Sequence, residues 1–261
     1  MRSLKIFLIT FLTSVCLVLF SFTVLYRFSF PSLNPADANG ENIPIAAPDS
    51  TDNKTILIFA NGEKSGIFAL LKLNAVDKKI SFVTFPKDFI PPKSSRSLIE
   101  SFEYAGIMQC VQDLSECFDI SINHHMLIDS EILTAICRSF SPVSCNIISS
   151  PIPSNIQCFE DNSIGIDELA YIMDTQNELT EQELKFISEV CLKIIQNNLE
   201  NIQNYALSDI IKNMSYLTTD IGKQEIGKLS RIISLFQRAN PQFVFGVMPQ
   251  NSTSENLNSF L

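Results

Sequence analysis

The stretch Thr55-Ile56-Leu57-Ile58-Phe59-Ala60, followed at once by Asn61-Gly62, is the segment that decides the fold. A short apolar run that ends in a turn signal is typical of a strand buried on both faces of a sheet. Two further apolar runs, 67–73 and 79–85, are separated by a short polar loop, and Pro86 follows the second. This arrangement predicts a hairpin whose pairing ends at the proline, because proline lacks the backbone donor.

The remaining predicted elements follow from a change of apolar spacing beyond the Pro91-Pro92 pair. Thr180 and Glu183 form a capping box, the pattern that begins a helix. The spacing predicts strands at 126–128, 145–148 and 243–247, and helices within 98–105, 107–114, 132–136, 184–195, 207–211 and 226–236, the last being the final helix. Because strands and helices alternate in the first half and helices dominate the second, we expect an α/β domain: a three-layer α/β/α fold with a mixed central sheet.

An uncharged apolar segment, IFLITFLTSVCLVLFSFTVLY, covers residues 6–26. A helix of about 21 residues rises about 31 Å, which matches the hydrocarbon thickness of a bilayer. A cleaved signal peptide would end in a small-x-small site, and none follows, so we expect an uncleaved anchor. Arg2 and Lys5 precede the segment and only Arg27 follows it, which predicts a cytoplasmic N-terminus. We therefore expect a single-pass cell-membrane protein whose domain is extracytoplasmic.

Composition divides the rest of the chain into a linker, a domain and a tail. Four prolines among small polar residues predict a flexible linker over 27–53. We expect the folded domain over 54–249 and a polar, frayed tail over 250–261, with residues 1–5 as the cytoplasmic end. Hydrophobic residues make up 46% of the chain, which is enough for a sizeable core.

The charge balance excludes one class of partner. The net charge is -9, and the only charged residues among the first 27 are three basic ones, so the remainder carries about -12. Nucleic-acid binding depends on the neutralisation of phosphates by Lys and Arg. We therefore expect no nucleic-acid partner.

Four segments of the predicted domain resemble motifs of the LytR-CpsA-Psr (LCP) family. They are residues 64–88, which end in Phe85-Pro86-Lys87-Asp88, and the segments ESFEYAG at 100–106, INHHMLID at 122–129 and IDELAY at 166–171. The resemblance covers roughly residues 54–249, with degenerate motifs. It implies a cell-envelope protein related to the transferases that attach glycopolymers from polyprenyl-pyrophosphate carriers to peptidoglycan. It also implies an apolar groove for the lipid, arginines on the pyrophosphate and acidic residues on a magnesium ion.

The chain departs from this pattern at the charged positions. The two acidic positions of the metal site fall on Gly62 and Gly66, and the arginine of the Pro-Arg-Asp motif is Lys87. Later arginines of the pattern fall on 173–175 and near 182–187, where only Lys185 is basic. Lysine can hold a phosphate as a point charge but lacks the bidentate guanidinium fork. The resemblance therefore implies a non-catalytic relative with no magnesium or other cofactor, whose partners are a polyprenyl-linked lipid, peptidoglycan or an active homologue.

Two other functions stay open at this stage: an active transferase with an altered site, and an unrelated exported interaction or sensor domain. The candidate ligand-binding residues are Lys64, Lys87 and Asp88, which retain a weak capacity for phosphate. Each also has a structural interpretation as part of a solvated strand end or turn. No catalytic residue is predicted, and no metal ligands are, because the adjacent His124 and His125 should point to opposite faces of a strand.

Six cysteines lie beyond the predicted anchor: Cys110, Cys117, Cys137, Cys145, Cys158 and Cys191. An even count in an exported domain permits disulfides, and buried free thiols are equally compatible with a domain of this size. Cys110 and Cys117 fall on one predicted helix about 10 Å apart along its axis, so they should not bond to each other.

Overall fold

The structure is a computed structural model that describes residues 47–136, 140–153, 162–175, 178–199, 202, 217–250 and 252–261. The described part from Pro48 onward forms one compact unit. The predicted anchor at 6–26 and the predicted helical segment at 207–211 lie outside the described residues. From residue 47 onward, the described helices include none that is long and apolar enough to cross a bilayer.

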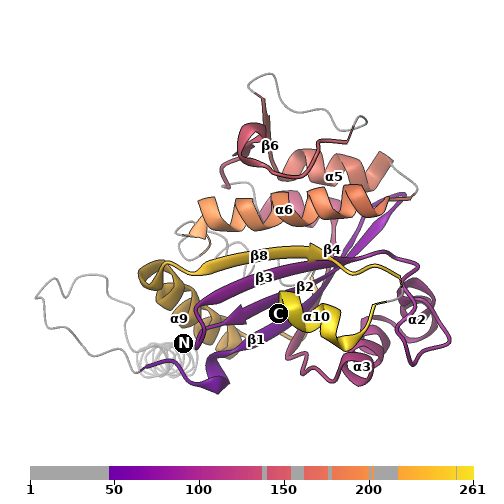
Figure 1. Cartoon of the computed structure of the whole chain (residues 1–261), viewed down its shortest axis with the longest axis horizontal. Helices are drawn as coiled ribbons and strands as arrows, with labels where there is room; N and C mark the ends of the chain where they lie inside the picture. The colour runs from indigo at the N-terminus through magenta and orange to yellow at the C-terminus, as the bar shows by residue number, and fades with distance from the viewer. Residues whose placement is uncertain are drawn as a thin grey trace, which may run out of the picture. The chain divides into compact units, whose positions relative to one another are not determined.

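A six-stranded mixed sheet forms the centre of the unit (Figure 1). Its strands lie in the order β7-β4-β1-β2-β3-β8, in which β1 with β4 and β3 with β8 are parallel and the other neighbours are antiparallel. The strands are β1 (Lys54–Asn61), β2 (Gly66–Asn74), β3 (Lys79–Phe85), β4 (His124–Asp129), β7 (Thr218–Thr219) and β8 (Gln242–Val247). The mixed α/β fold, the buried first strand and the hairpin that ends before Pro86 are thus confirmed.

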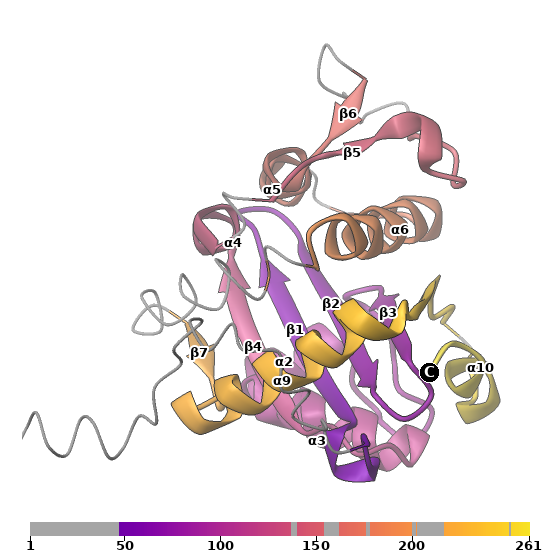
Figure 2. The same ribbon diagram turned by 90° about the vertical axis from the view of Figure 1, so that its left-hand side faces the viewer.

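Alternating side chains of these strands build a separate core on each face of the sheet. Leu57, Phe68 and Phe85 point to one face, where they pack against α2 (Leu98–Ala105), α3 (Ile107–Phe118) and α10 (Ser254–Phe260). Ile56, Ala69 and Phe82 point to the other face. That face is covered by α6 (Glu181–Asn197) and α9 (Lys223–Ala239), with α5 (Ile166–Thr175) packed beside α6 (Figure 2). Successive side chains of a strand point to opposite faces of the sheet, and here both faces are buried. Consecutive residues are therefore apolar, which explains the continuous apolar runs of the sequence.

The capping box predicted at the start of α6 is present. The Thr180 hydroxyl accepts a hydrogen bond from the Glu183 amide at 3.3 Å, and the Glu183 carboxylate accepts one from the Thr180 amide at 2.7 Å. The two groups satisfy backbone donors that a helix otherwise leaves open at its N-terminus. Local sequence therefore fixes where α6 begins.

The predicted strand at 145–148 is wrong. The strand in this region is β5 (Val143–Ser144), which pairs with β6 (Ser163–Ile164), and Cys145–Ile147 forms the short 3-10 turn η2. The Ile147 side chain is 50% exposed, so the apolar run does not correspond to a buried strand. The preceding α4 (Ser130–Ile136) matches its predicted position.

The prediction of a frayed polar tail is also wrong, because α10 forms a final helix within the tail. Leu257 is fully buried and Leu261 is 8% exposed, both in the core that holds α2 and α3. The Ser81 hydroxyl of β3 donates a hydrogen bond to the Phe260 carbonyl at 2.7 Å. A single apolar stripe spaced by three and four residues is therefore enough to dock this mostly polar segment.

Of the predicted linker at 27–53, only residues 47–53 are described. Ser50–Asp52 form the 3-10 turn η1, which Asp49 caps by accepting a hydrogen bond from the Thr51 amide at 2.7 Å. The Asn53 side-chain oxygen accepts a hydrogen bond from the Ala75 amide at 2.9 Å. The last residues before β1 are therefore attached to the hairpin loop.

Candidate functional site

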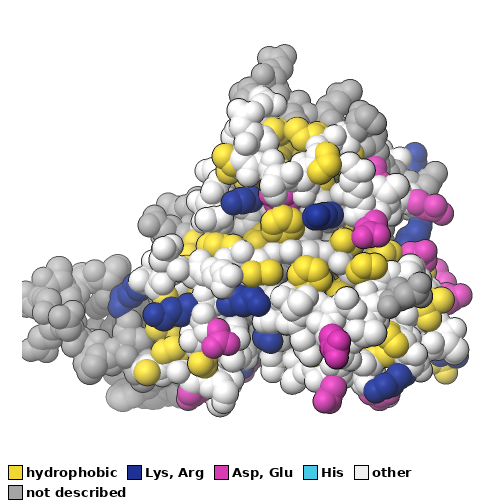
Figure 3. Space-filling view, in the orientation of Figure 1, with side chains coloured by type: hydrophobic (Ala, Val, Ile, Leu, Met, Phe, Trp, Pro, Cys, Tyr) yellow, Lys and Arg dark blue, Asp and Glu magenta, His cyan; other side chains and the backbone are white. Residues whose placement is uncertain are grey.

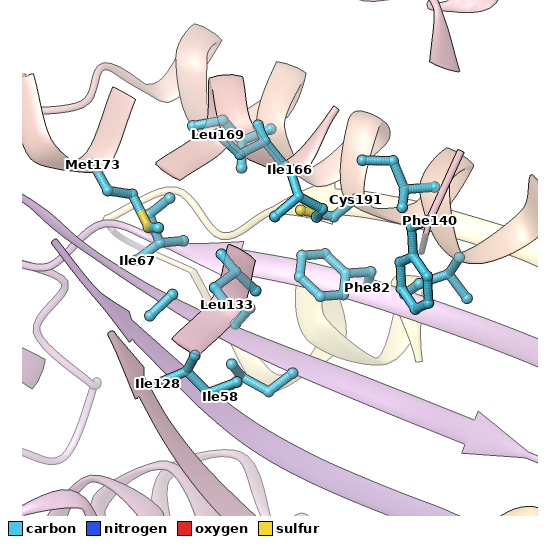
Figure 4. A pocket seen from close by; sticks show the side chains of 15 residues that line it. Ile58, Ile67, Phe82, Ile128, Leu133, Phe140, Ile166, Leu169, Met173 and Cys191 are labelled. Carbon is cyan, nitrogen blue, oxygen red and sulfur yellow. The ribbon is translucent and has the colours of Figure 1, made fainter. Parts of the chain in front are cut away.

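An apolar cavity of about 190 Å³ lies between the sheet and the helices α4, α5 and α6 (Figure 4). All of its lining residues are apolar: Ile58, Ala60, Ile67, Ala69, Phe82, Ile128, Leu133, Phe140, Ile166, Leu169, Met173, Ile187, Cys191, Ile194 and Ile195. Alternate residues of β1 and β2 face it because successive strand side chains point to opposite faces. Apolar side chains on all sides favour apolar groups as the contents of such a cavity.

A second, polar pocket of about 120 Å³ is lined by Ser65, Gly66, Lys87, Asp88, Glu178, Leu179 and Leu184. It lies where the loop after β3 meets the start of β2 and the segment that leads into α6. The structure thus brings Lys87 and Asp88 into one pocket. Lys64 is exposed on the neighbouring loop and does not line the pocket.

The two pockets have no lining residue in common, but residues close in the sequence line one or the other. Gly66 lines the polar pocket and the next residue, Ile67, lines the apolar cavity. Leu184 and Ile187 lie one turn apart on α6 and line the polar and the apolar pocket, respectively.

The loop between β1 and β2 is attached to the end of α5. The Met173 carbonyl accepts hydrogen bonds from the Ser65 amide at 2.9 Å, the Ser65 hydroxyl at 3.2 Å and the Lys64 amide at 3.4 Å. The Met173 side chain lines the apolar cavity. The same residue therefore fixes the loop and forms part of the cavity wall.

Neither glycine at the expected acidic positions leaves room for a side chain. A Cβ on Gly62 would lie 2.5 Å from the backbone carbon and oxygen of Met173. A Cβ on Gly66 would overlap the ring of Phe59. That ring is held by stacking on Phe68, with centroids 4.1 Å apart, and by an edge contact with Phe102. The positions are occupied by neighbours, so a carboxylate cannot enter either one without movement of the surroundings.

The structure reveals site residues that the sequence did not single out. Glu178 and Ser65 line the polar pocket; Glu178 lies in none of the motif segments, and Ser65 lies in the segment 64–88 but was not predicted as a ligand-binding residue. The only available signal was the position of Glu178 just before the capping box. The apolar cavity draws on segments spread from residue 58 to 195, so no local pattern predicts it.

The two histidines face one carboxylate at the edge of the sheet. Asp220 lies 3.6 Å from the Nδ1 atom of His124 and 3.4 Å from that of His125, and it also accepts the His125 amide at 2.9 Å. Glu225 lies 3.6 Å from the Nε2 atom of His124. Among the described residues, no group of three or more His, Cys, Asp or Glu side chains is arranged to hold a metal ion.

The described cysteines are Cys110, Cys117, Cys145 and Cys191, of which Cys110 and Cys117 are free thiols. Cys110 and Cys117 lie on α3, so the expectation that they do not bond to each other is confirmed. Burial, together with the nearby Asp113 carboxylate, raises the pKa of the Cys110 thiol to about 12. Cys110 is therefore a structural residue, and Cys137 and Cys158 lie outside the described residues.

The strand order and the helices on both faces define an LCP-like fold, since LCP-family enzymes are among the solved structures that align with it. TagV of Bacillus subtilis aligns with a TM-score of 0.54 at 11% identity, over 74% of this chain and 84% of TagV. TagT with bound LIIa-WTA aligns with a TM-score of 0.54 at 13% identity, over 81% of this chain and 85% of TagT.

A protein from Eubacterium siraeum DSM 15702, provisionally named as a transcription regulator, aligns with a TM-score of 0.63 at 16% identity, over 82% of this chain and 92% of that protein. At these identities the likeness concerns the fold. The sequence matches no known family profile and no curated protein.

Proposed function

We propose that this chain is an LCP-like cell-envelope protein, anchored in the membrane by residues 6–26, that binds the apolar part of an amphiphilic envelope molecule. We further propose that it does not catalyse glycopolymer transfer. The observation that carries the proposal is the wholly apolar cavity beside a polar pocket. Two solved structures of one fold neighbour, TagT, support it, because they were solved with bound LI-WTA and with bound LIIa-WTA.

The absence of transfer chemistry follows from what the polar pocket contains. Its titratable side chains are those of Lys87, Asp88 and Glu178, with no guanidinium among them. Transfer from a pyrophosphate needs positive charge on the leaving phosphate, supplied by arginine, lysine or a metal ion. The positions that would carry the metal-binding carboxylates are the two blocked glycines. Among the described residues, Lys87 is therefore the one basic side chain that lines the pocket, and it stands against the two acidic side chains of Asp88 and Glu178.

A cavity-filling variant tests the binding function. Ala69 is 2% exposed and lines the cavity from β2, so Ala69→Leu adds three carbon atoms to the empty space. We expect the purified full-length protein to bind 1-octanol by isothermal titration calorimetry, and we expect the variant to lose at least about tenfold in affinity. Filling a cavity maintains or raises stability, so a thermal melt separates this loss from misfolding. Ala105→Leu, on the exposed end of α2, is the matched control.

The catalytic half of the proposal has its own measurement. We expect no magnesium-dependent release of lipid phosphate from a polyprenyl-pyrophosphate glycan above the level given by Lys87→Ala. Turnover that depends on Lys87 would overturn this half and favour an active transferase with an altered site. Equal binding of octanol by the wild type and Ala69→Leu would overturn the assignment of the cavity.

A further inference from the structure

The apolar cavity is small for a lipid tail. A cavity of about 150 Å³ lined by aliphatic and aromatic side chains accepts benzene, so about 190 Å³ accommodates roughly seven or eight carbon atoms. The second isoprene unit of a polyprenyl chain already exceeds this volume. The cavity therefore has room for a short hydrocarbon group and not for a polyprenyl tail.

The length of the cavity is limited by side chains at its two ends. Figure 4 shows Met173 and Ile67 at one end and Phe82 at the other. Phe82 pairs with Leu71, which lies four residues beyond Ile67 on β2, so about 13 Å of sheet separates the ends. The Phe82 side chain also belongs to the core beneath α9, so its ring ends the cavity on that side.

The helix that covers the cavity, α6, is attached to the sheet by buried hydrogen bonds. The fully buried Ser188 hydroxyl donates to the carbonyl oxygens of Phe82, at 2.8 Å, and Gly246, at 2.9 Å. The Thr84 hydroxyl donates to the Leu184 carbonyl at 3.2 Å. Moving α6 away from the sheet to admit a longer chain would leave these buried polar groups unpaired, which costs free energy. The packing therefore opposes enlargement of the cavity.

We infer that the apolar part of the ligand is a single hydrocarbon group of at most about eight carbon atoms, and that Phe82 sets this limit. The inference rests on the proposed function, because it assumes that the cavity holds an apolar group. It favours a short alkyl, acyl or aromatic group and excludes a polyprenyl tail that is buried in full. On the face shown in Figure 3, apolar side chains are interspersed with charged ones, whereas the cavity lining is wholly apolar and offers hydrocarbon the better environment.

A series of 1-alkanols tests the length limit. The probes run from 1-pentanol to 1-dodecanol and are titrated calorimetrically into the full-length protein in detergent, with the heat of titration into detergent alone subtracted. We expect affinity to rise by roughly fourfold per methylene group up to 1-octanol, which is the value of burying one methylene. From 1-octanol to 1-dodecanol we expect affinity to stay within about twofold, because the added methylenes are not buried.

Two variants should move the limit in opposite directions. Ala69→Leu fills part of the cavity, so the rise should end near 1-pentanol and the affinity for 1-octanol should fall by at least about tenfold. Phe82→Ala removes the ring at the end of the cavity, so affinity should keep rising to 1-dodecanol. Phe243→Ala should keep the wild-type limit, since Phe243 packs in the core beneath α9 without lining the cavity. Ala105→Leu, on the exposed end of α2, should keep it as well.

The possible outcomes separate this inference from the proposed function. Binding of none of the alcohols by the wild type would overturn the proposed function itself. A wild-type affinity that rises as steeply beyond 1-octanol as before it would overturn only the length limit. An unchanged limit in Phe82→Ala, with a thermal melt showing that the variant is folded, would overturn the role of Phe82. If Phe82→Ala does not fold, the milder Phe82→Leu should still extend the rise to 1-decanol, and an unchanged limit there would overturn the same claim.

Discussion

Restoring an acid at residue 62 should destabilise the protein without creating a working metal site. Gly62 is where the LCP resemblance places one metal-binding acid, and Gly62→Asp would put a carboxylate back there. The glycine has no left-handed backbone conformation, so an aspartate suffers no dihedral penalty. Its cost is steric, because the new Cβ would lie 2.5 Å from the carbonyl carbon and oxygen of Met173. These are backbone atoms, and no change of rotamer can move them aside.

The size of the destabilisation follows from how far the end of α5 must shift to admit the new side chain. Ordinary contacts of a Cβ begin near 3.4 Å, so the end of α5 must shift by about 0.9 Å. Such a shift stretches the three hydrogen bonds that the Met173 carbonyl accepts from Lys64 and Ser65. Loss of two of them costs about 2 kcal/mol, and overpacking adds about 1–3 kcal/mol. We therefore expect Gly62→Asp to lower the free energy of unfolding by about 3–5 kcal/mol.

Urea denaturation followed by circular dichroism measures this free energy. Gly227→Asp is the matched control, since it makes the same change at an exposed glycine of α9 with nothing within 4 Å of the added Cβ. Magnesium should not rescue the Gly62→Asp variant. Two outcomes would refute the steric argument: equal stability of the two variants, or a urea midpoint that magnesium raises for Gly62→Asp alone. Either result would mean that residue 62 has room for a carboxylate beside the end of α5.

Three further predictions follow from buried groups. Burial raises the pKa of Glu189, but hydrogen bonds from Ser149 and Ser150 hold it below its ordinary value overall. Its stabilising contribution is therefore present above pH of about 4.3, the unfolded value, and is lost as pH falls through the lower folded value. Denaturation at neutral pH should show that Glu189→Gln has a free energy of unfolding about 2 kcal/mol below that of the wild type. This difference between variant and wild type should shrink at acidic pH. The exposed Glu131→Gln should match the wild type. The raised pKa of the Cys110 thiol should make it resist iodoacetamide at pH of about 8 until urea is added. Peptide mass spectrometry measures this labelling, and labelling of Cys110 in the folded protein would contradict its burial. Leu257→Ala should cost about 2–4 kcal/mol because Leu257 anchors α10, and Ile152→Ala, at a side chain that is 42% exposed, should cost little.

The parts of the fold that the sequence predicted are those whose signals are local. The buried first strand and the following hairpin are marked by apolar runs with turns between them, and the start of α6 by its capping box. The tail was mispredicted because α10 depends on Leu257 and its neighbours finding a tertiary site. The run at 145–148 was mispredicted because apolar character alone does not supply a partner strand.

The candidate site was only partly predictable for a related reason. Lys87 and Asp88 lie in a recognisable motif, and the structure places them together in the polar pocket. Glu178 reaches the same pocket from a segment about 90 residues further along the chain. The glycines at 62 and 66 read in the sequence as missing acids, whereas the structure places backbone or aromatic atoms where their side chains would be.

The blocked acid position and the apolar cavity are two consequences of one contact. The Met173 carbonyl occupies the space that a side chain at residue 62 would need, and the Met173 side chain lines the cavity. Ile166 and Leu169 of the same helix line the cavity as well. A shift of α5 large enough to admit an aspartate at 62 would therefore displace the cavity wall. Gly62→Asp should weaken octanol binding even in the molecules that stay folded, and Gly227→Asp should not. In this chain, the packing that forms the apolar cavity is the same packing that leaves no room at residue 62 for the acid that the LCP resemblance places there.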